Sequence, residues 1–267
     1  MFRRLVVCLF VAVSVLGFAP VSSGHHYVAI QPGVERPGPR IGGDASAPPP
    51  CTYNFIFRDQ KKRRYIGIAG HCAGFATNGV GQEMHVTDVG RIGTVVWETP
   101  YPDGRNCGFE GLRPEGAEYC TDFALVEIDR ALYGHIDPAV RHWGGPTGFV
   151  PSEEIEAGMT MYHYGRGTGL HASEMTRPRV GVVLGTVTGG CGYRTAFPTT
   201  PGDSGSPQIA GDGRALGFMT LAEGDGALGM SIGCVLDAAA KAGYRLKLET
   251  APLTDAVQRE QDRIAHS

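Results

Sequence analysis

The sequence predicts an all-β protein built from many short strands. Glycine accounts for 40 of the 267 residues, and only 19% of the residues are charged. Short apolar runs recur along the chain and are separated by glycine-rich turns, which is the pattern of strands joined by tight connections. Strands of this length and spacing favour a sandwich or a barrel.

The β signal falls into two groups of runs, on either side of a turn-rich stretch at residues 144–151. Each run is short and rich in apolar or β-branched residues, as expected for strands. The runs are residues 53–57, 64–69, 91–98, 122–128, 159–164, 180–187, 207–209, 215–221 and 228–232.

One helix is expected at residues 234–244, where Val235, Leu236 and three alanines precede a glycine that is a typical helix stop. The polar tail at residues 251–267 allows two interpretations. It is either a short helix, with Leu253, Val257 and Ile264 on one face, or a disordered terminus.

Residues 1–23 have the pattern of an export signal. Arg3 and Arg4 precede an apolar run of 14 residues, and small residues follow before Gly24. A membrane anchor is the alternative, but a spanning helix needs about 20 apolar residues. We therefore expect a secreted, extracellular protein that does not bind a membrane. An irregular Pro- and Gly-rich segment at residues 24–50 is expected before the folded domain.

Six cysteines remain once the signal is removed, and an even number in an exported chain indicates disulfides. Many pairings are possible. Pairing each cysteine with its nearest neighbour along the chain gives Cys51–Cys72, Cys107–Cys120 and Cys191–Cys234.

A metal site is the alternative, but the chain has no Cys-x-x-Cys pair, and adjacent His71 and Cys72 are poorly placed to chelate. No metal and no cofactor are expected. The net charge of −3 argues against a nucleic-acid partner.

The sequence Gly202-Asp203-Ser204-Gly205-Ser206-Pro207 is the sharpest chemical signal. Glycines on both sides of the serine permit a special turn that brings a substrate carbonyl close to the main chain. The backbone N–H groups of such a turn can point together at a developing oxyanion. An ordinary Gly/Ser loop is the alternative.

Two further patterns supply a base and a carboxylate. His71 follows an apolar strand and two small residues, which leave room for another group against its ring. Asp122 leads directly into a strongly apolar strand, so its carboxylate is expected at the edge of the core, where the Nδ1–H group of His71 is a suitable partner. A structural histidine and a turn-capping aspartate are the alternatives. Asp129 is a rival carboxylate, although it has the setting of a solvated strand end.

In chain order His71, Asp122 and Ser204, with their local sequences, resemble the chymotrypsin-like (trypsin-like) serine protease family, in character closest to its secreted bacterial members. The resemblance covers roughly residues 51–250. It implies two antiparallel six-stranded β-barrels that divide near residues 135–155, a C-terminal helix, and an active site between the barrels. It also implies a peptide-hydrolysing triad of His71, Asp122 and Ser204, with the N–H groups of Gly202 and Ser204 as the oxyanion hole.

The family pattern has implications beyond the triad. The Cys51–Cys72 pair matches the disulfide that the family has beside its histidine, and the specificity pocket is expected to be lined by Pro198, Thr199, Thr200, Thr220, Leu221 and Ala222. Pro198 stands where trypsin has its selecting aspartate, so small or apolar substrate side chains are favoured. We expect a monomer that acts on polypeptide substrates.

Two features depart from the family or vary within it. Ser206 stands where many members have a second glycine. The sequence Arg40-Ile41-Gly42-Gly43 resembles the activation cleavage of the trypsin branch, in which the new isoleucine amine pairs with the aspartate before the serine, here Asp203. Only a short stretch separates Ile41 from Cys51, however.

Two other functions remain open. One is a catalytically inactive binding protein on the same fold, against which the complete triad argues. The other is an esterase, but the Gly-x-Ser-x-Gly elbow of α/β-hydrolases and their Ser–Asp–His chain order are both missing.

Overall fold

The computed structural model describes residues 40–43, 45–47, 51–73, 79–87, 89–99, 121–167, 176–187, 190–223 and 226–266. The expected signal segment, most of residues 24–50 and the Cys107–Cys120 pair lie outside these residues. Within the described part of the chain, no helix is long and apolar enough to cross a membrane.

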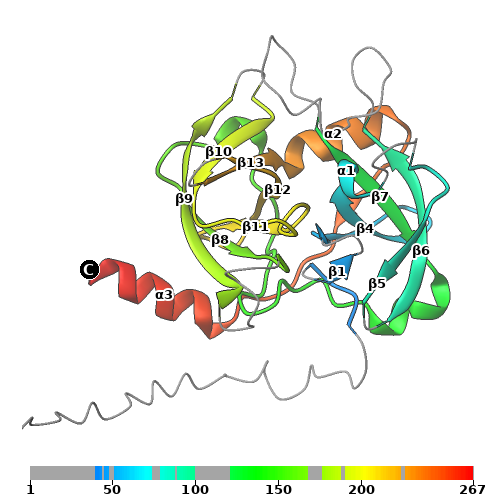
Figure 1. Cartoon of the computed structure of the whole chain (residues 1–267), viewed down its shortest axis with the longest axis horizontal. Coiled ribbons are helices and arrows are strands. Elements are labelled where there is room, and N and C mark those ends of the chain that lie inside the picture. The colour runs from blue at the N-terminus through cyan, green and yellow to red at the C-terminus, as the bar shows by residue number, and fades with distance from the viewer. Residues whose placement is uncertain are drawn as a thin grey trace, which may run out of the picture.

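Five strands from the first half of the chain and one from near its C-terminus, β14, form a six-stranded antiparallel sheet in the order β14-β3-β4-β7-β6-β5, on the right of Figure 1. Its edge strands, β14 and β5, are not joined to each other by strand pairing within the described residues. Its strands are β3 (Ile56–Arg58), β4 (Arg64–Ala69), β5 (Glu83–Val86), β6 (Gly90–Glu98), β7 (Phe123–Ile128) and β14 (Lys247–Leu248).

The second half forms a closed six-stranded barrel in the order β10-β13-β12-β11-β8-β9, on the left of Figure 1. Its strands are β8 (Thr160–Tyr164), β9 (Pro178–Thr186), β10 (Gly192–Ala196), β11 (Pro207–Ala210), β12 (Ala215–Glu223) and β13 (Gly226–Ser231). The predicted all-β class with a C-terminal helix is confirmed: of the two expected six-stranded barrels, the second is closed, and the first is an antiparallel sheet of six strands within the described residues.

Only the last two residues of the predicted run at 53–57 form a strand, and residues 53–55 connect that strand to a shorter one before it. Residues 51–52 form β2 (Cys51–Thr52), which pairs with β1 (Ser46–Ala47), and β3 begins only at Ile56. Between them the side chain of Asn54 accepts a hydrogen bond from the N–H group of Phe55 at 2.7 Å. The backbone here remains bonded to β4, because the N–H of Asn54 donates to the carbonyl of Gly67 and the N–H of Gly67 donates to the carbonyl of Phe55.

One hydrophobic core cluster spans both units, and the barrel has a second cluster of its own. Phe123 of the first sheet meets Phe218 of the barrel with ring centroids 5.5 Å apart, and both rings are fully buried. One continuous cluster of buried side chains includes both residues together with Tyr162 and Met230 of the barrel. The sheets are therefore held in fixed relation by apolar packing.

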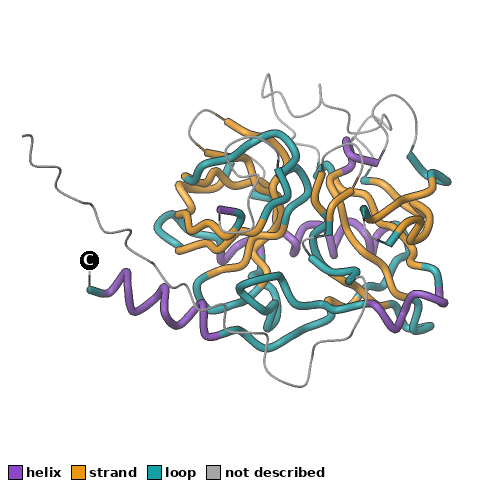
Figure 2. The backbone as a smooth tube through the Cα atoms, turned by 60° about the horizontal axis from the view of Figure 1, so that its bottom comes forward, coloured by secondary structure: helices purple, strands orange, loops and turns teal. Residues whose placement is uncertain are grey.

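The predicted helix is α2 (Ile232–Lys241), which begins two residues earlier than expected. Ser231 caps it, because its hydroxyl accepts a hydrogen bond from the N–H group of Gly233. Gly243 follows the helix with φ of +92°. Beyond it, Tyr244 donates a hydrogen bond to the carbonyl of Val96 in the first sheet. As Figure 2 shows, α2 runs from the barrel toward that sheet.

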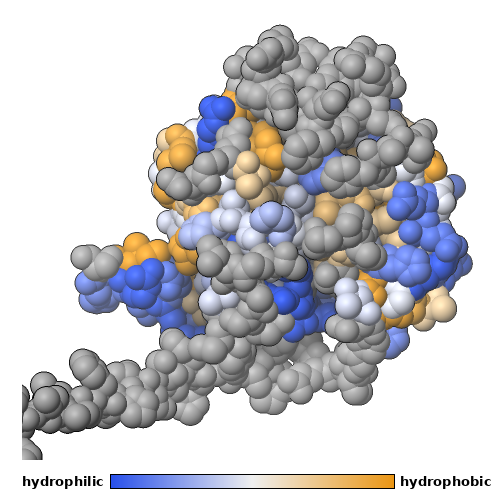
Figure 3. Space-filling model, in the orientation of Figure 1, coloured by the Kyte–Doolittle hydropathy of each residue, from blue (hydrophilic) through white to orange (hydrophobic). Residues whose placement is uncertain are grey.

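The tail follows the helical interpretation: α3 spans Asp255–Ala265. Val257 is buried, but Ile264 is 41% exposed, so the apolar face is only partly covered. Gln261 donates a hydrogen bond to the carbonyl of Gly211, which ties the helix to the barrel. Most of the visible surface of α3 is hydrophilic (Figure 3).

Candidate active site

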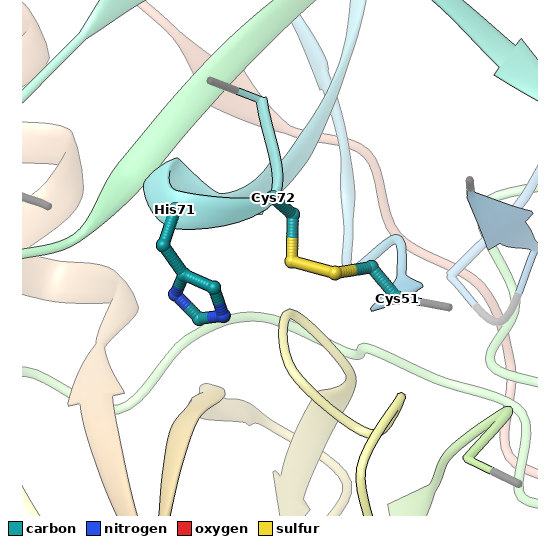
Figure 4. Close-up of side chains that lie close together, drawn as sticks. All are labelled: Cys51, His71 and Cys72. Atoms are coloured by element: carbon teal, nitrogen blue, oxygen red, sulfur yellow. A yellow bond between two sulfur atoms is a disulfide. The ribbon is translucent and has the colours of Figure 1, made fainter. Parts of the chain in front are cut away.

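His71 is carried by α1 (Gly70–Ala73), a single helical turn that follows β4 directly. Its side chain is 4% exposed. The next residue, Cys72, forms a disulfide with Cys51, as predicted, and Figure 4 shows this bridge beside the imidazole. The bridge connects the turn that carries His71 to β2.

Asp122 lies immediately before β7 and is fully buried. Its Oδ2 atom is 2.8 Å from Nδ1 of His71, and its Oδ1 atom accepts the backbone N–H of His71 at 2.9 Å. A Cβ atom on Gly70 would lie 3.2 Å from Oδ1, so the small residue before the histidine makes room for the carboxylate. Both carboxylate oxygens therefore hold His71. The rival, Asp129, is exposed and pairs with Arg91 instead.

The position of Asp122 requires an uncommon backbone. Its φ is +41°, a backbone angle that residues other than glycine seldom adopt. Its carbonyl accepts the N–H of Gly70, and the N–H of the following Phe123 donates to the hydroxyl of Thr99 at 2.9 Å. The surrounding hydrogen bonds thus hold a conformation that the chain would not take by itself.

The carboxylate sets the proton affinity of the imidazole. Burial lowers the pKa of His71, but the charge of Asp122 and its hydrogen bond outweigh burial, and the net pKa is raised above the usual value. Because Nδ1 is paired with Asp122, proton exchange with a nucleophile would use the other ring nitrogen, Nε2.

Ser204 lies in the loop between β10 and β11. Gly202 and Gly205 on either side have φ of +101° and +88°, so the turn needs glycine at both positions. A Cβ atom on Gly205 would lie 3.0 Å from the N atom of Ala69, at the end of the strand that leads to His71. The serine loop is therefore packed against the segment that carries the histidine.

The serine loop also presents two free donors. Among the hydrogen bonds of the described residues, the backbone N–H groups of Gly202 and Ser204 have no acceptor. The hydroxyl of Ser204 is 3.5 Å from the carbonyl of Thr220, at the outer limit of a hydrogen bond. The hydroxyl proton of Ser204 therefore makes no strong hydrogen bond to this carbonyl.

Thr52 fastens this loop to β2. Its backbone N–H donates to the carbonyl of Ser204 at 2.8 Å, and its hydroxyl donates to the carbonyl of Gly202 at 2.9 Å. The same hydroxyl accepts the N–H of Arg166 at 2.9 Å. Thr52 is fully buried, so these bonds are shielded from water. No local sequence pattern marks Thr52, which lies just before a predicted strand run and was not among the expected site residues.

Asp203 is held from the opposite side by Arg179 of β9. The guanidinium contacts both carboxylate oxygens at 2.7 and 2.9 Å, and both side chains are buried. The N–H groups of Gly167 and Thr200 donate to the same carboxylate. Burial raises the pKa of Asp203, but these bonds and the nearby charges outweigh it and hold the pKa below its usual value.

These contacts bear on the activation cleavage suggested by residues 40–43. Ile41 is buried, and its N–H donates to the carbonyl of His135. Arg40 pairs with Asp137. The carboxylate of Asp203 is already paired with the guanidinium of Arg179. It therefore does not need the α-amino group that cleavage before Ile41 would create.

The described cysteines are bonded to each other. Cys191–Cys234 joins the segment before β10 to α2, as predicted. The sulfur atoms of Cys51 and Cys72 lie near the ring of His71, which is a grouping of metal-ligand types, but the disulfide between them removes the thiolates that a metal would need.

The six residues expected to line the pocket lie on two segments near Ser204. Thr199 donates to the carbonyl of Gly226 and Thr220 to that of Leu228, so both hydroxyls are engaged with β13. Pro198 and Ala222 are exposed, Thr200 is buried, and Leu221 is half-buried. On the β11 side of β12, the strand ladder ends at Phe218 and backbone hydrogen bonds to the serine loop continue to Met219, within the described residues.

No family model and no curated protein matches the sequence. Solved structures do match. A glutamic-acid-specific serine protease that utilizes a histidine triad in substrate binding is 18% identical, with a TM-score of 0.50, and covers 78% of this chain and 100% of its own. The Nocardiopsis protease NAPase is 16% identical, with a TM-score of 0.49 and the same coverage. The HtrA-type protease AlgW with a decapeptide is 13% identical, with a TM-score of 0.45, and covers 73% of this chain and 53% of its own.

The first of these structures, together with the strand order described above, defines the fold class. The chain has the fold of the chymotrypsin-like serine proteases. At this level of identity the likeness concerns the fold.

The Arg179–Asp203 pair gives a test of this architecture. Arg179→Met leaves a buried carboxylate without its cation, which costs about 3–5 kcal/mol of unfolding free energy at neutral pH. Because the folded pKa of Asp203 is lowered, the contribution of the pair is present above the unfolded pKa of about 3.9 and is lost as the pH falls through the folded value. Urea unfolding at neutral and acidic pH measures both effects.

Arg214→Met is the matched control, because Arg214 pairs with Asp212 and Glu154 at the surface. It should cost less than about 1 kcal/mol. Equal losses in the two variants, or a loss for Arg179→Met that does not shrink in acid, would contradict the role given to the buried pair.

Proposed function

We propose that this protein is a secreted serine endopeptidase that hydrolyses polypeptides through an acyl-enzyme on Ser204. The observation that carries the proposal is the buried His71–Asp122 pair, with a 2.8 Å contact, together with the packing of the serine loop against the end of the strand that leads to His71. A histidine oriented by a carboxylate is the base that a serine nucleophile needs.

Acylation uses the three side chains in sequence. The hydroxyl oxygen of Ser204 attacks the peptide carbonyl while Nε2 of His71 takes its proton. Asp122 keeps the other nitrogen protonated and stabilises the imidazolium that forms. The N–H groups of Gly202 and Ser204, which have no acceptor within the described structure, donate to the oxyanion.

His71 then protonates the leaving amine, and the peptide bond breaks to give an ester on Ser204. A water molecule attacks this ester, with His71 again accepting the proton. The released acid product restores the free hydroxyl. No cofactor or metal enters these steps.

The substrate is proposed to lie as an extended strand along residues 220–222. Their edge on the β11 side is unpaired within the described residues, and a peptide can add to such an edge through main-chain hydrogen bonds. Small or apolar side chains fit the expected pocket residues. None of these six residues is a histidine, so the acidic preference of the glutamic-acid-specific neighbour is not carried over.

Export to the extracellular space belongs to the same proposal. Two disulfides are formed, at Cys51–Cys72 and Cys191–Cys234, and such bonds persist in oxidising compartments. The pattern of residues 1–23 supports the same location.

Active-site labelling tests the proposal directly. The folded, disulfide-bonded protein should react with a fluorophosphonate probe at Ser204, because only an activated serine attacks the phosphorus at a useful rate. Labelling should be absent in Ser204→Ala and after heat denaturation. A folded wild-type protein that takes no label would favour the inactive binding protein.

The role of Asp122 predicts a change in both rate and pH dependence. Asp122→Asn should lower kcat by about 10⁴, the factor for this substitution in the family that the sequence resembles. Activity needs neutral His71, so kcat/KM rises as pH increases through its raised pKa. The variant loses the charge that raises this pKa, and its acid limb should move to lower pH.

Asp129→Asn serves as the control, because Asp129 is exposed and pairs with Arg91 rather than with His71. Steady-state kinetics on a peptide substrate across the pH range should show wild-type behaviour for this variant. Retained activity in Asp122→Asn would mean that another carboxylate serves the histidine.

A further inference from the structure

Ser206 follows the serine loop and departs from the glycine that many proteins of the resembled family have at this place. Its side chain is fully buried, although it carries a hydroxyl. A buried hydroxyl must be hydrogen-bonded or it destabilises the fold. Its partners therefore indicate what it does.

The hydroxyl of Ser206 donates to the carbonyl oxygen of Asp203 at 2.5 Å. The backbone N–H of Ser206 donates to the same oxygen at 2.9 Å. Both lone pairs of this carbonyl oxygen therefore accept hydrogen bonds from Ser206.

The carbonyl of Asp203 and the N–H of Ser204 belong to one peptide unit. Because this unit is planar and trans, the carbonyl and the N–H point in opposite directions. Fixing the carbonyl thus fixes the direction of the N–H of Ser204. Hydrogen bonds to a carbonyl also polarise its amide, which strengthens the N–H as a donor.

His163 supports Ser206 from the interior of the barrel. The hydroxyl oxygen lies 3.3 Å from Nε2 and 3.4 Å from Nδ1 of this fully buried ring. The single hydroxyl proton is used on Asp203, so toward the ring the oxygen can act only as an acceptor. The ring is itself held by Phe197, with centroids 4.6 Å apart, and the carbonyl of His163 accepts the indole N–H of Trp143.

We propose that Ser206, backed by His163, is a positioning residue that aims and strengthens the oxyanion donor at the N–H of Ser204. The inference rests on the proposed function, since the oxyanion exists only if Ser204 attacks a carbonyl. The role belongs to the Ser206 hydroxyl, which a protein with glycine at this position lacks.

The test is Ser206→Ala, which removes the hydroxyl and keeps the backbone donor. The loss of one hydrogen bond should lower kcat about fivefold to tenfold on a peptide anilide, with KM within twofold of wild type. The affinity for a peptide aldehyde, whose hemiacetal oxygen occupies the oxyanion position, should fall by the same factor as kcat/KM.

Ser231→Ala is the matched control. Ser231 is an equally buried serine whose hydroxyl caps α2, away from the serine loop. Its loss should lower stability without changing kcat or aldehyde affinity. An unchanged kcat in Ser206→Ala, or a raised KM with kcat unchanged, would overturn the inference.

The amide ¹⁵N resonance of Ser204 gives a readout that needs no activity. Removal of the hydroxyl donor from the Asp203 carbonyl should move this resonance to lower frequency in Ser206→Ala and leave it in place in Ser231→Ala. An unmoved resonance overturns the inference. If the resonance moves in Ser206→Ala but the wild-type protein hydrolyses no peptide, the positioning geometry is supported and only the proposed function is contradicted.

Discussion

Two hydrogen bonds from Thr52 to the serine loop are the constraint on which the site depends. They bind the carbonyls of Gly202 and Ser204, so a loop of the barrel is fixed to β2, beside the first sheet. The residue before Thr52 is Cys51, whose disulfide leads to Cys72 and thus to His71. The histidine and the serine are therefore joined by a short path of one covalent bridge and two buried hydrogen bonds.

Buried charge completes the arrangement and carries an energetic cost. Asp122 and Asp203 are both fully buried carboxylates. Removing a carboxylate from water is unfavourable unless several donors replace the water. Asp122 gains the ring and the N–H of His71, and Asp203 gains Arg179 and two backbone N–H groups. Each pair contributes a defined geometry more than net stability, because apolar packing such as that of Phe123 on Phe218 is the larger stabilising effect.

The sequence identified those parts of the site that local chemistry marks. Glycines around Ser204 and small residues before His71 are needed by the backbone positions they occupy, and the structure shows why at Gly205 and Gly70. Arg179 and Thr52 were missed, because their roles come from partners distant in the chain. An arginine before an apolar run and a threonine after a cysteine have no local pattern that distinguishes them from ordinary strand residues.

The same limit applies to the fold. Strand β4 was predicted at its exact bounds because its buried side is continuous. Strands β5 and β10 were missed, since β5 alternates exposed polar residues with buried ones over only four positions and β10 begins with glycine. The short strands β1, β2 and β14 are defined by their partners in the folded chain rather than by their own residues.

In the proposed mechanism His71 and Ser204 act together on the same bound substrate, the serine at the carbonyl carbon and the histidine on the protons. A peptidyl chloromethyl ketone tests it most directly, because the serine adds to the ketone while Nε2 of the histidine displaces chloride from the adjacent carbon. Peptide mapping by mass spectrometry should find His71 alkylated in the wild-type protein and unmodified in Ser204→Ala. Alkylation of another residue, or alkylation of His71 that persists without Ser204, would contradict the account.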